Sequence, residues 1–279
     1  MSEIFQTDVA IIGAGPVGLF AVFQCGMLGM TCHVFDSLDH IGGQCTALYP
    51  EKPIYDIPAA PAISAAALIE HLERQAAPFA PVYHLGQTVT QVSGQAGDFT
   101  LMTSAGKIAK AKAIVIAAGA GAFGPHRPPL DNLAEYEGTS VFYSIRHTAP
   151  FAGQRLVIAG GGDSAVDWAN ALAPIAAHIY VVHRRDKFRA APASLDTLQS
   201  HVAAGRVELV TPYQLAALHG QNGRLNSVDV VDMDGQTRSL AAEGLLPFFG
   251  LSTDLGPIAT WGLDVKNHQI PVTQGTAQT

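Results

Sequence analysis

The chain has 279 residues and a formal net charge of −7 at pH 7, and 48% of its residues are hydrophobic against 14% charged. This length predicts two domains, the acidic balance argues against nucleic-acid binding, and no apolar run approaches the roughly 20 residues of a membrane span. Because the N-terminus MSEIFQTD lacks a positively charged segment and only three cysteines are present, we expect a cytoplasmic protein with no secretory signal, membrane span or disulfide scaffold.

The first dinucleotide-binding pattern follows the first expected strand. Residues 7–12 (TDVAII) form a short, β-branched apolar run, as a buried parallel strand does. They lead into residues 13–18 (GAGPVG), which match G-x-G-x-x-G, and a helical apolar pattern follows. A second strand at 31–35 ends at Asp36, 23 residues after Gly13. This complete βαβ unit predicts a nucleotide site, and a glycine-rich turn without a ligand is the alternative.

Each residue type in this pattern has its own physical role. The first glycine allows the tight turn, the second lets the backbone approach a pyrophosphate, and the third lets helix and strand pack closely. The amino end of the helix offers free N–H groups to the phosphates. The carboxylate of Asp36 can accept hydrogen bonds from a ribose diol, so this end of the site suits an unmodified ribose.

Further elements complete the first domain in chain order. We expect a helix near 64–75, a β-rich excursion at 82–92 and 98–110, and a buried strand at 113–118 that ends in glycines. A stretch rich in proline, GPHRPP at 124–129, follows as a rigid crossover made of turns.

The same βαβ pattern occurs a second time. A strand at 154–160 (QRLVIAG) leads into residues 160–165 (GGGDSA), which match the G-x-G-x-x-A variant. A helix is expected next, and the following strand at 177–182 ends at His183. His183 lies 23 residues after Gly160, the offset that Asp36 has from the first motif. The chain therefore carries the nucleotide-binding unit twice.

The two patterns differ in charge at the ribose position. The first has an acid there, whereas the second has His183-Arg184-Arg185, with Arg189 close behind. Arginine attracts a 2′-phosphate and can bind it through two hydrogen bonds, whereas a carboxylate repels it. The second site is therefore expected to prefer NADP(H) over NAD(H), and a basic surface turn is the alternative. The first, acidic site suits the adenosine end of FAD, to which NADPH would deliver hydride.

The positions of the motifs indicate how the domains are arranged in the sequence. We expect an α/β fold with two Rossmann-like, three-layer nucleotide-binding domains, the NADP domain being inserted into the FAD domain. The expected FAD-binding domain covers 1–121 and 251–279, and the expected NADPH-binding domain covers 122–250. The crossovers near 119–125 and 248–254 are natural hinges.

Several motifs resemble one known family over essentially the whole chain. The sequence is similar to the ferredoxin–NADP⁺ reductases of the thioredoxin-reductase-like type. The resemblance implies FAD, NADPH, a homodimer, and one-electron delivery to ferredoxin or flavodoxin. The motifs that carry it are GAGPVGLF (13–20), IGGQCTALYPEKPIYDIP (41–58), AGAGAF (118–123), FAGQRLVIAGGGDSAVDWA (151–169), HRRDKFRA (183–190) and GLSTDLGPIATWGLD (250–264).

The motifs and this resemblance together imply two sets of site residues. In such proteins the aromatic ring at the position of Tyr49 stacks on the isoalloxazine, and the acid at Asp56 lies near the flavin. The implied FAD contacts are Gly13, Gly15, Pro16, Gly18, Asp36, Gly43, Gln44, Tyr49, Asp56, Val89, Gly119 and Phe123. The implied NADP contacts are Gly160, Gly161, Gly162, Asp163, Ser164, Ala165, His183, Arg184, Arg185 and Arg189.

Other polar and aromatic residues receive smaller roles. No acid–base residue is assigned, since Asp56 and His147 are candidates by location alone. The eleven histidines show no metal-ligand spacing, so we expect no metal. Trp168 and Trp261 are expected to be core or domain-contact residues.

The cysteine pattern separates this chain from disulfide reductases. A thioredoxin reductase carries C-x-x-C before its second glycine motif, where this chain has Tyr143-Ser-Ile-Arg-His147. A glutathione-reductase-type enzyme has a second cysteine five residues after the first, and here Pro50 follows Cys45 at that distance. Because disulfide exchange needs a paired thiol, electrons are expected to leave the flavin directly. Cys45 is expected to be a small residue beside the flavin, and a disulfide reductase is the disfavoured alternative.

The C-terminal part departs from the family pattern. The resemblance implies a strand such as 270–273 followed by a segment with Gly-Asp that completes the FAD site, whereas this sequence ends at Thr279. We therefore expect FAD binding to be weakened. The remaining alternative is a catalytically impaired nucleotide-binding remnant that senses NADP(H).

Overall fold

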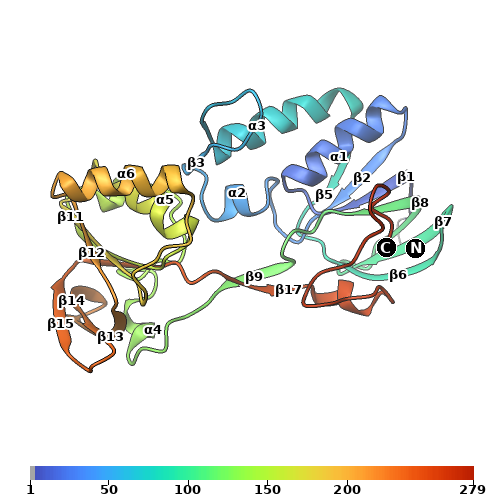
Figure 1. The fold of residues 1–279 in the computed structure, drawn as a ribbon. Helices are drawn as coiled ribbons and strands as arrows, with labels where there is room; N and C mark the ends of the chain where they lie inside the picture. Colours follow the sequence, from blue (N-terminus) through green and yellow to red (C-terminus); the bar gives the residue numbers. More distant parts are fainter. Residues whose placement is uncertain (1–3) are drawn as a thin grey trace. The chain divides into compact units, whose positions relative to one another are not determined.

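The protein is described by a computed structural model that covers residues 4–279, except the side chains of residues 122 and 123. The contact expected from the Phe123 side chain therefore lies outside the described residues. The chain forms two compact units, the first made of residues up to 124 together with 252–279 and the second of 125–251. Both units are coloured along the sequence in Figure 1.

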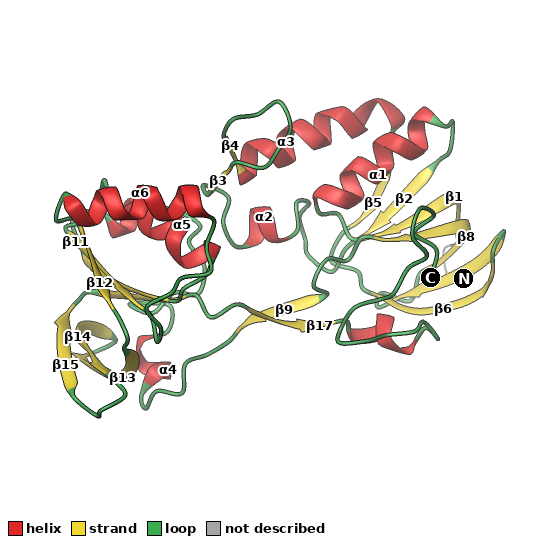
Figure 2. Cartoon of the chain, in the orientation of Figure 1, coloured by secondary structure: helices red, strands yellow, loops and turns green. Residues whose placement is uncertain are grey.

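The first unit is built on a mixed sheet of six strands (Figure 2). Its order is β5-β2-β1-β8-β7-β6, in which β5, β2, β1 and β8 run parallel and β7 and β6 continue antiparallel. The bounds are β1 Ile4–Ile12, β2 Cys32–Phe35, β5 Val82–His84, β6 Val89–Gln95, β7 Asp98–Thr103 and β8 Ile108–Ile116.

One strand of this sheet differs from the sequence-based expectation. The β-rich excursion and the buried strand at 113–118 were expected as separate elements, but β8 runs through both. It pairs with the whole of β1, from Ile4 opposite Ile108 to Ile12 opposite Ile116. The long partner strand therefore keeps the polar stretch around Lys110 and Lys112 extended.

Two long helices cover one face of this sheet. Helix α1 spans Pro16–Met27 and α3 spans Ala65–Ala76, and the two pack against each other (Figure 1). The Ser64 side chain caps α3 by accepting a hydrogen bond of 3.2 Å from the backbone N–H of Ala67. The apolar core on this face joins α1 and α3 to β1 and β2. The smaller elements on the chain between the two helices are α2 (Gln44–Ala47), β3 (Pro53–Ile54) and β4 (Ile63–Ser64).

The opposite face of the sheet is covered by a second apolar cluster. Val89 of β6 and Leu101 of β7 are buried there with Ala10 and Phe35. Trp261 packs against this cluster, just after the 3-10 helix η3 (Gly256–Thr260). The C-terminal part of the first unit thus returns to the sheet. Residues 270–273, which were expected to form a strand, adopt no regular structure. Pro271 has no N–H to donate to a neighbouring strand.

The second unit has three layers. Its central parallel sheet has the order β12-β11-β10-β16, with β10 Arg155–Ala159, β11 His178–Val182, β12 Val207–Val210 and β16 Gly244–Pro247. Helices α5 (Asp163–Leu172) and α6 (Pro192–Ala203) cover one face, as Figures 1 and 2 show. The other face carries an antiparallel meander that the sequence analysis did not identify, made of β13 Gln214–Gln221, β14 Arg224–Val231 and β15 Thr237–Ala241. The short helix α4 (Leu133–Tyr136) joins the same core.

The two crossovers between the units pair with each other. The expectation at 124–129 was a crossover made of turns, but its first residues belong to a strand, β9 (Ala122–Pro125). β9 pairs with β17 (Leu251–Asp254), and the Ser252 hydroxyl donates a 3.0 Å hydrogen bond to the Gly124 carbonyl. Each of these two strands supplies the other with hydrogen-bond partners, so both stay extended. Within residues 4–279 no helix has both the length and the apolar character that crossing a membrane requires.

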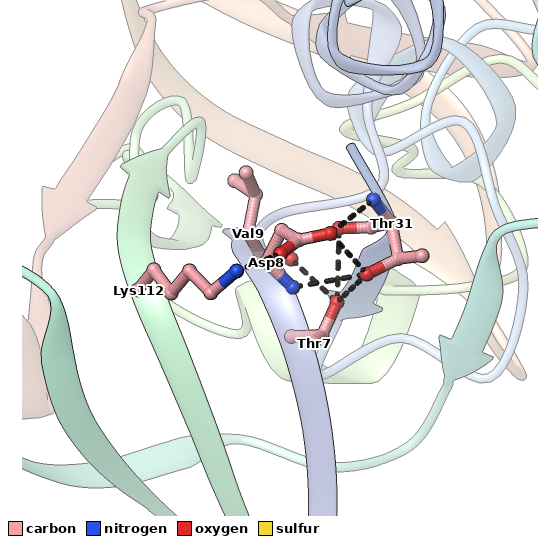
Figure 3. Close-up of polar contacts among 5 residues, drawn as sticks. All are labelled: Thr7, Asp8, Val9, Thr31 and Lys112. Carbon is pink, nitrogen blue, oxygen red and sulfur yellow. Dashed lines mark hydrogen bonds and ion pairs between the residues drawn. The ribbon is translucent and has the colours of Figure 1, made fainter. Parts of the chain in front are cut away.

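A polar network ties strands β1 and β8 of the first unit to the residue that precedes β2 (Figure 3). One carboxylate oxygen of Asp8, on β1, accepts hydrogen bonds from the Thr31 backbone N–H at 2.9 Å and from its hydroxyl at 2.8 Å. The other oxygen lies 2.7 Å from the Lys112 ammonium of β8. Lys112 and Thr31 together hold the pKa of Asp8 well below its ordinary value of 3.8. The carboxylate therefore stays ionised through most of the acid range.

We predict that Asp8→Asn lowers the Tm at neutral pH by a few degrees at most, because the pair is exposed. A carboxyl with a lowered pKa stabilises the fold fully above its ordinary pKa and loses this contribution as the pH falls below it. The gap in Tm between the parent and Asp8→Asn should thus be constant above about pH 5 and close on further acidification. Thermal unfolding between pH 7 and pH 2.5 measures it, with Asp98→Asn as a control on the same sheet. A gap that widens in acid would contradict this.

Candidate functional site

A cavity of about 530 Å³ opens in the first unit at the carboxyl ends of the parallel strands. Ligands of open α/β sheets bind at this edge. The residues that line it come from the loop after β1, the end of β2, the loop before α2, the start of β6, the end of β8 and the η3 segment. They are residues 12, 13, 15–17, 35–38, 43–45, 49, 87–89, 116–119, 121, 255–258 and 261.

The glycine loop after β1 brings the backbone close to this cavity. Gly13 has a φ of 109°, and a β-carbon there would overlap the Ala117 carbonyl oxygen. Gly18 lies behind the loop, where a β-carbon would overlap the Gly13 carbonyl, so helix and strand pack in direct contact. The N-cap of α1 is Gly15, which provides no side-chain cap. The first N–H groups of α1 are thus available to an anion.

Asp36 lies at the end of β2 with its carboxylate held by the backbone. One oxygen accepts a 2.6 Å hydrogen bond from the Ala14 N–H and the other a 2.8 Å hydrogen bond from the Leu38 N–H. A carboxylate has acceptor capacity for about four hydrogen bonds, so each oxygen retains a free position. Asp36 lines the cavity and can accept hydrogen bonds from a diol there.

The segment after β2 closes the cavity from the other side. The Gly42 N–H donates a 2.8 Å hydrogen bond to the Ala14 carbonyl, and the Gly43 backbone lies against Gly15. Tyr49 and Cys45 line the wall, four residues apart, and their side chains interact with each other. Burial raises the pKa of the Cys45 thiol and, with Cys45, raises the pKa of Tyr49 to about 12. Both groups therefore remain protonated at neutral pH.

Most of the residues expected for the first site lie around this cavity. Gly13, Gly15, Pro16, Asp36, Gly43, Gln44, Tyr49, Val89 and Gly119 line it. Gly18 lies behind the loop, and Asp56 is exposed and does not line the cavity.

Sequence reasoning missed the part of the wall that comes from the C-terminal segment. Trp261 packs against the core, as expected, and it also lines the cavity with Leu255 and Ile258. Its indole Nε1 is buried and has no hydrogen-bond partner among the described residues. A buried N–H without a partner is costly, so this donor is suited to a polar atom of a ligand. The one signal for it in the sequence is the motif GPIATW.

A second cavity of about 610 Å³ lies at the carboxyl edge of the sheet in the second unit. The glycine loop at 160–162 and the start of α5 form one side. The N-cap of α5 is Gly162, again without a side-chain cap, and a β-carbon on it would meet no atom within 4 Å. Free N–H groups therefore face open space here, as they do in the first unit.

The basic segment after β11 forms the other side of the second cavity. Arg184, Arg185 and Arg189 line it and are exposed. The His183 ring lies against Gly161, so close that a β-carbon at Gly161 would overlap it. Burial lowers the pKa of His183, and the three arginines lower it further. His183 is therefore neutral at pH 7, and the positive charge of this wall comes from the arginines.

The expected second-site residues also gather at this cavity, with one exception. Residues 160–164, 183–185 and 189 line it, whereas Ala165 is buried behind Gly160. The wall also includes residues that sequence reasoning did not identify, namely Pro128, Pro129, Tyr213, Gln214, Leu215, Phe248, Phe249 and Gly250. His147 lies on the surface away from both linings.

The three cysteines of the chain do not form disulfides in the structure. Cys25, Cys32 and Cys45 are free and buried, and Cys45 is the one that lines a cavity. No group of three or more His, Cys, Asp or Glu side chains within residues 4–279 is arranged to hold a metal ion.

Comparison with known proteins defines the class. Residues 7–279 match the family model of the pyridine nucleotide-disulphide oxidoreductases. Two solved structures share the fold. Thioredoxin reductase from T. acidophilum has a TM-score of 0.84 and 19% identity, and the match covers 96% of this chain and 85% of that one. Thioredoxin reductase from Lactococcus lactis has a TM-score of 0.81 and 21% identity, with the same coverage of both chains. At this identity they support the fold alone.

Closer relatives define the group within this class. Ferredoxin–NADP reductase of Acidiphilium cryptum is 61% identical over 100% of this chain and 83% of its own length. The enzymes of that name from Rhodospirillum rubrum and Gluconobacter oxydans are 58% and 56% identical to this chain. The matches cover 100% and 99% of this chain, respectively, and 82% of each relative's length. The chain belongs to the pyridine nucleotide-disulphide oxidoreductases and, among them, to the ferredoxin–NADP reductase family. Membership implies FAD and NAD(P) as cofactors.

We predict that Trp261→Phe weakens FAD binding to the apoprotein by roughly three- to tenfold, because it removes one buried hydrogen-bond donor from the cavity wall. Titration with FAD measures the affinity, and the quenching of tryptophan fluorescence should be smaller than in the parent. The affinity for 2′,5′-ADP serves as the control, since its expected site is in the other unit. An FAD affinity equal to that of the parent would show that the indole N–H has another role.

Proposed function

We propose that this chain is an FAD-dependent ferredoxin–NADP⁺ oxidoreductase that works as a homodimer. It passes hydride from NADPH to FAD and single electrons from FAD to ferredoxin or flavodoxin. The observation that carries the proposal is the opposite charge of two cavities built on the same βαβ pattern. Asp36 marks the first, and Arg184, Arg185 and Arg189 mark the second.

The first cavity fits FAD. The free N–H groups at the start of α1 suit the pyrophosphate, and Asp36 suits the diol of the adenosine ribose. Tyr49 offers an aromatic face to the isoalloxazine, and Trp261 Nε1 offers a donor. When bound, FAD supplies the redox chemistry, since it accepts two electrons as a hydride and releases them one at a time.

The second cavity fits NADPH as the hydride donor. The start of α5 suits its pyrophosphate, and the three arginines suit its 2′-phosphate. The neutral His183 lies beside them and packs on the glycine loop, so it contributes shape and hydrogen bonding rather than charge. The contribution of the protein to hydride transfer is to bind and orient the two partners.

The thiols argue for a direct transfer to a one-electron acceptor. A disulfide reductase needs a second thiol and a reactive thiolate. The lining of the first cavity contains one cysteine, Cys45, and burial keeps it protonated. The side chains around it therefore favour ferredoxin or flavodoxin over a disulfide as the acceptor.

The direct experiment uses purified protein reconstituted with FAD. The proposal requires a visible flavin spectrum, NADPH oxidation and ferredoxin reduction. NADPH binding without any flavin absorption after reconstitution would instead indicate a nucleotide-binding protein that senses NADP(H). Turnover of an added disulfide such as oxidised thioredoxin, at the rate seen with ferredoxin, would also refute the proposal.

We predict that Arg184→Ala and Arg185→Ala each lower kcat/KM for NADPH by roughly tenfold or more, because each removes a charge-assisted contact to the 2′-phosphate. The value for NADH should change by less than about twofold, since NADH lacks this phosphate. Steady-state kinetics with both nucleotides measure the change. Arg206→Ala removes an exposed arginine from the same unit outside the cavity and is the matched control. Equal losses with NADH and NADPH would contradict the assignment.

We predict that Cys45→Ser retains NADPH-to-ferredoxin turnover within about twofold, because a buried, protonated thiol is a poor nucleophile and serine keeps a polar group beside Tyr49. Cytochrome c reduction coupled through ferredoxin measures the turnover, and the flavin spectrum reports whether FAD is retained. An inactive variant that still holds FAD would mean that Cys45 takes part in electron transfer.

A further inference from the structure

The basic segment of the second cavity is anchored to the glycine loop at two points. Residues 183–191 join β11 to α6 without forming a helix or strand. The Arg189 N–H donates a 2.7 Å hydrogen bond to the Gly161 carbonyl. The Ala191 N–H donates a 2.9 Å hydrogen bond to the Asp163 carboxylate, on the first turn of α5. Both anchors lie at the end of the segment that carries Arg189.

Two further contacts extend this attachment along α5. The Asp167 carboxylate accepts a 3.1 Å hydrogen bond from the Ser194 hydroxyl. The Asn170 side-chain amide donates a 2.9 Å hydrogen bond to the Ser194 carbonyl. Asp163, Asp167 and Asn170 are four and three residues apart, so they lie on one face of α5. This face holds the first turn of α6 and the segment that precedes it.

Asp163 has a second effect at the start of α6. The N-cap of α6 is Ala191, whose side chain provides no cap. The Asp163 carboxylate supplies an acceptor to the Ala191 N–H and a negative charge near the positive end of the α6 dipole. The same carboxylate lies on the first turn of α5, where a bound pyrophosphate would be repelled by it. Its bond to Ala191 offers a reason for an acid at this position.

We propose that Asp163 is a positioning residue for nucleotide selectivity. Through Ala191 it fixes the basic segment in the conformation that presents Arg184, Arg185 and Arg189 to a 2′-phosphate. The proposal rests on the proposed function, since it concerns the 2′-phosphate of NADP(H). It assigns to Asp163 an effect on the distinction between NADP(H) and NAD(H), rather than direct contact with the nucleotide.

Two variants separate this role from simple charge repulsion. Asp163→Asn keeps a side-chain oxygen that accepts from Ala191 and loses the charge, whereas Asp163→Ala loses both. Charge repulsion alone would make both variants bind any phosphate more tightly. A positioning role makes the alanine variant weaker than the asparagine variant, and only for ligands with a 2′-phosphate.

The experiment measures binding of 2′,5′-ADP and ADP to the FAD-reconstituted full chain by calorimetry at one ionic strength. We expect Asp163→Ala to bind 2′,5′-ADP roughly three- to tenfold more weakly than the parent, as the loss of one positioning hydrogen bond would produce. Asp163→Asn should bind it at least as tightly as the parent, and the ADP affinities of the two variants should agree with each other within about twofold, since both lose the charge. Asp196→Ala, which removes an exposed carboxylate from α6, is the matched control.

The other outcomes overturn the inference. Equal 2′,5′-ADP affinities for Asp163→Asn and Asp163→Ala would remove the role of the hydrogen bond. Equal losses with both ligands in Asp163→Ala would indicate general loosening, which far-UV circular dichroism and the Tm would also report. A parent protein that binds 2′,5′-ADP no more tightly than ADP would refute the NADP(H) preference itself, and the inference would fall with it. If the parent prefers 2′,5′-ADP to ADP and Asp163→Ala binds 2′,5′-ADP as tightly as the parent does, the inference is refuted while the proposed function stands.

Discussion

Unpaired backbone N–H groups at the amino ends of α1 and α5 are the constraint on which both units depend. A helix leaves its first N–H groups without intrahelical partners, and in this chain glycine N-caps leave them without side-chain caps as well. Such groups are stable where water or an anion reaches them, at the carboxyl edge of the parallel strands. The tight turns at Gly13 and Gly160, and the close packing behind them, follow from holding each helix at that edge.

The two units share this backbone solution and differ in the side chains that complete it. In the first, Asp36 is held by the N–H groups of Ala14 and Leu38, so its orientation is set by the loop that it faces. In the second, the equivalent position begins a segment whose charge comes from exposed arginines and whose backbone is fastened to Gly161 and Asp163. Under the proposed function, the backbone provides affinity for a dinucleotide, and a few side chains after the second strand determine which one is accepted.

Local patterns in the sequence predicted the parts of the fold that local interactions create. The glycine motifs, the strand-helix-strand units and the α3 helix capped by Ser64 belong to this group. The continuous β8 strand and the β9–β17 pair were not predicted, because a distant partner strand imposes their extended conformation. Trp261, Tyr213 and Phe248 could not be assigned to cavity walls for the same reason, since they reach the nucleotide loops only through tertiary packing. Asp163 was expected as a ligand contact, and its bond to Ala191 depends on where α6 begins.

The pairing of β9 with β17 has a consequence for how this architecture can change. The polypeptide leaves the first unit at Gly124 and re-enters it at Ser252, and these two residues are joined by a hydrogen bond. For the first unit, residues 125–251 are therefore one long insertion whose two ends lie next to each other. The entropic cost of such an insertion grows only slowly with its length. An insertion with adjacent ends places little constraint on the host sheet, so under the proposed function each half can change its nucleotide preference with little effect on the other.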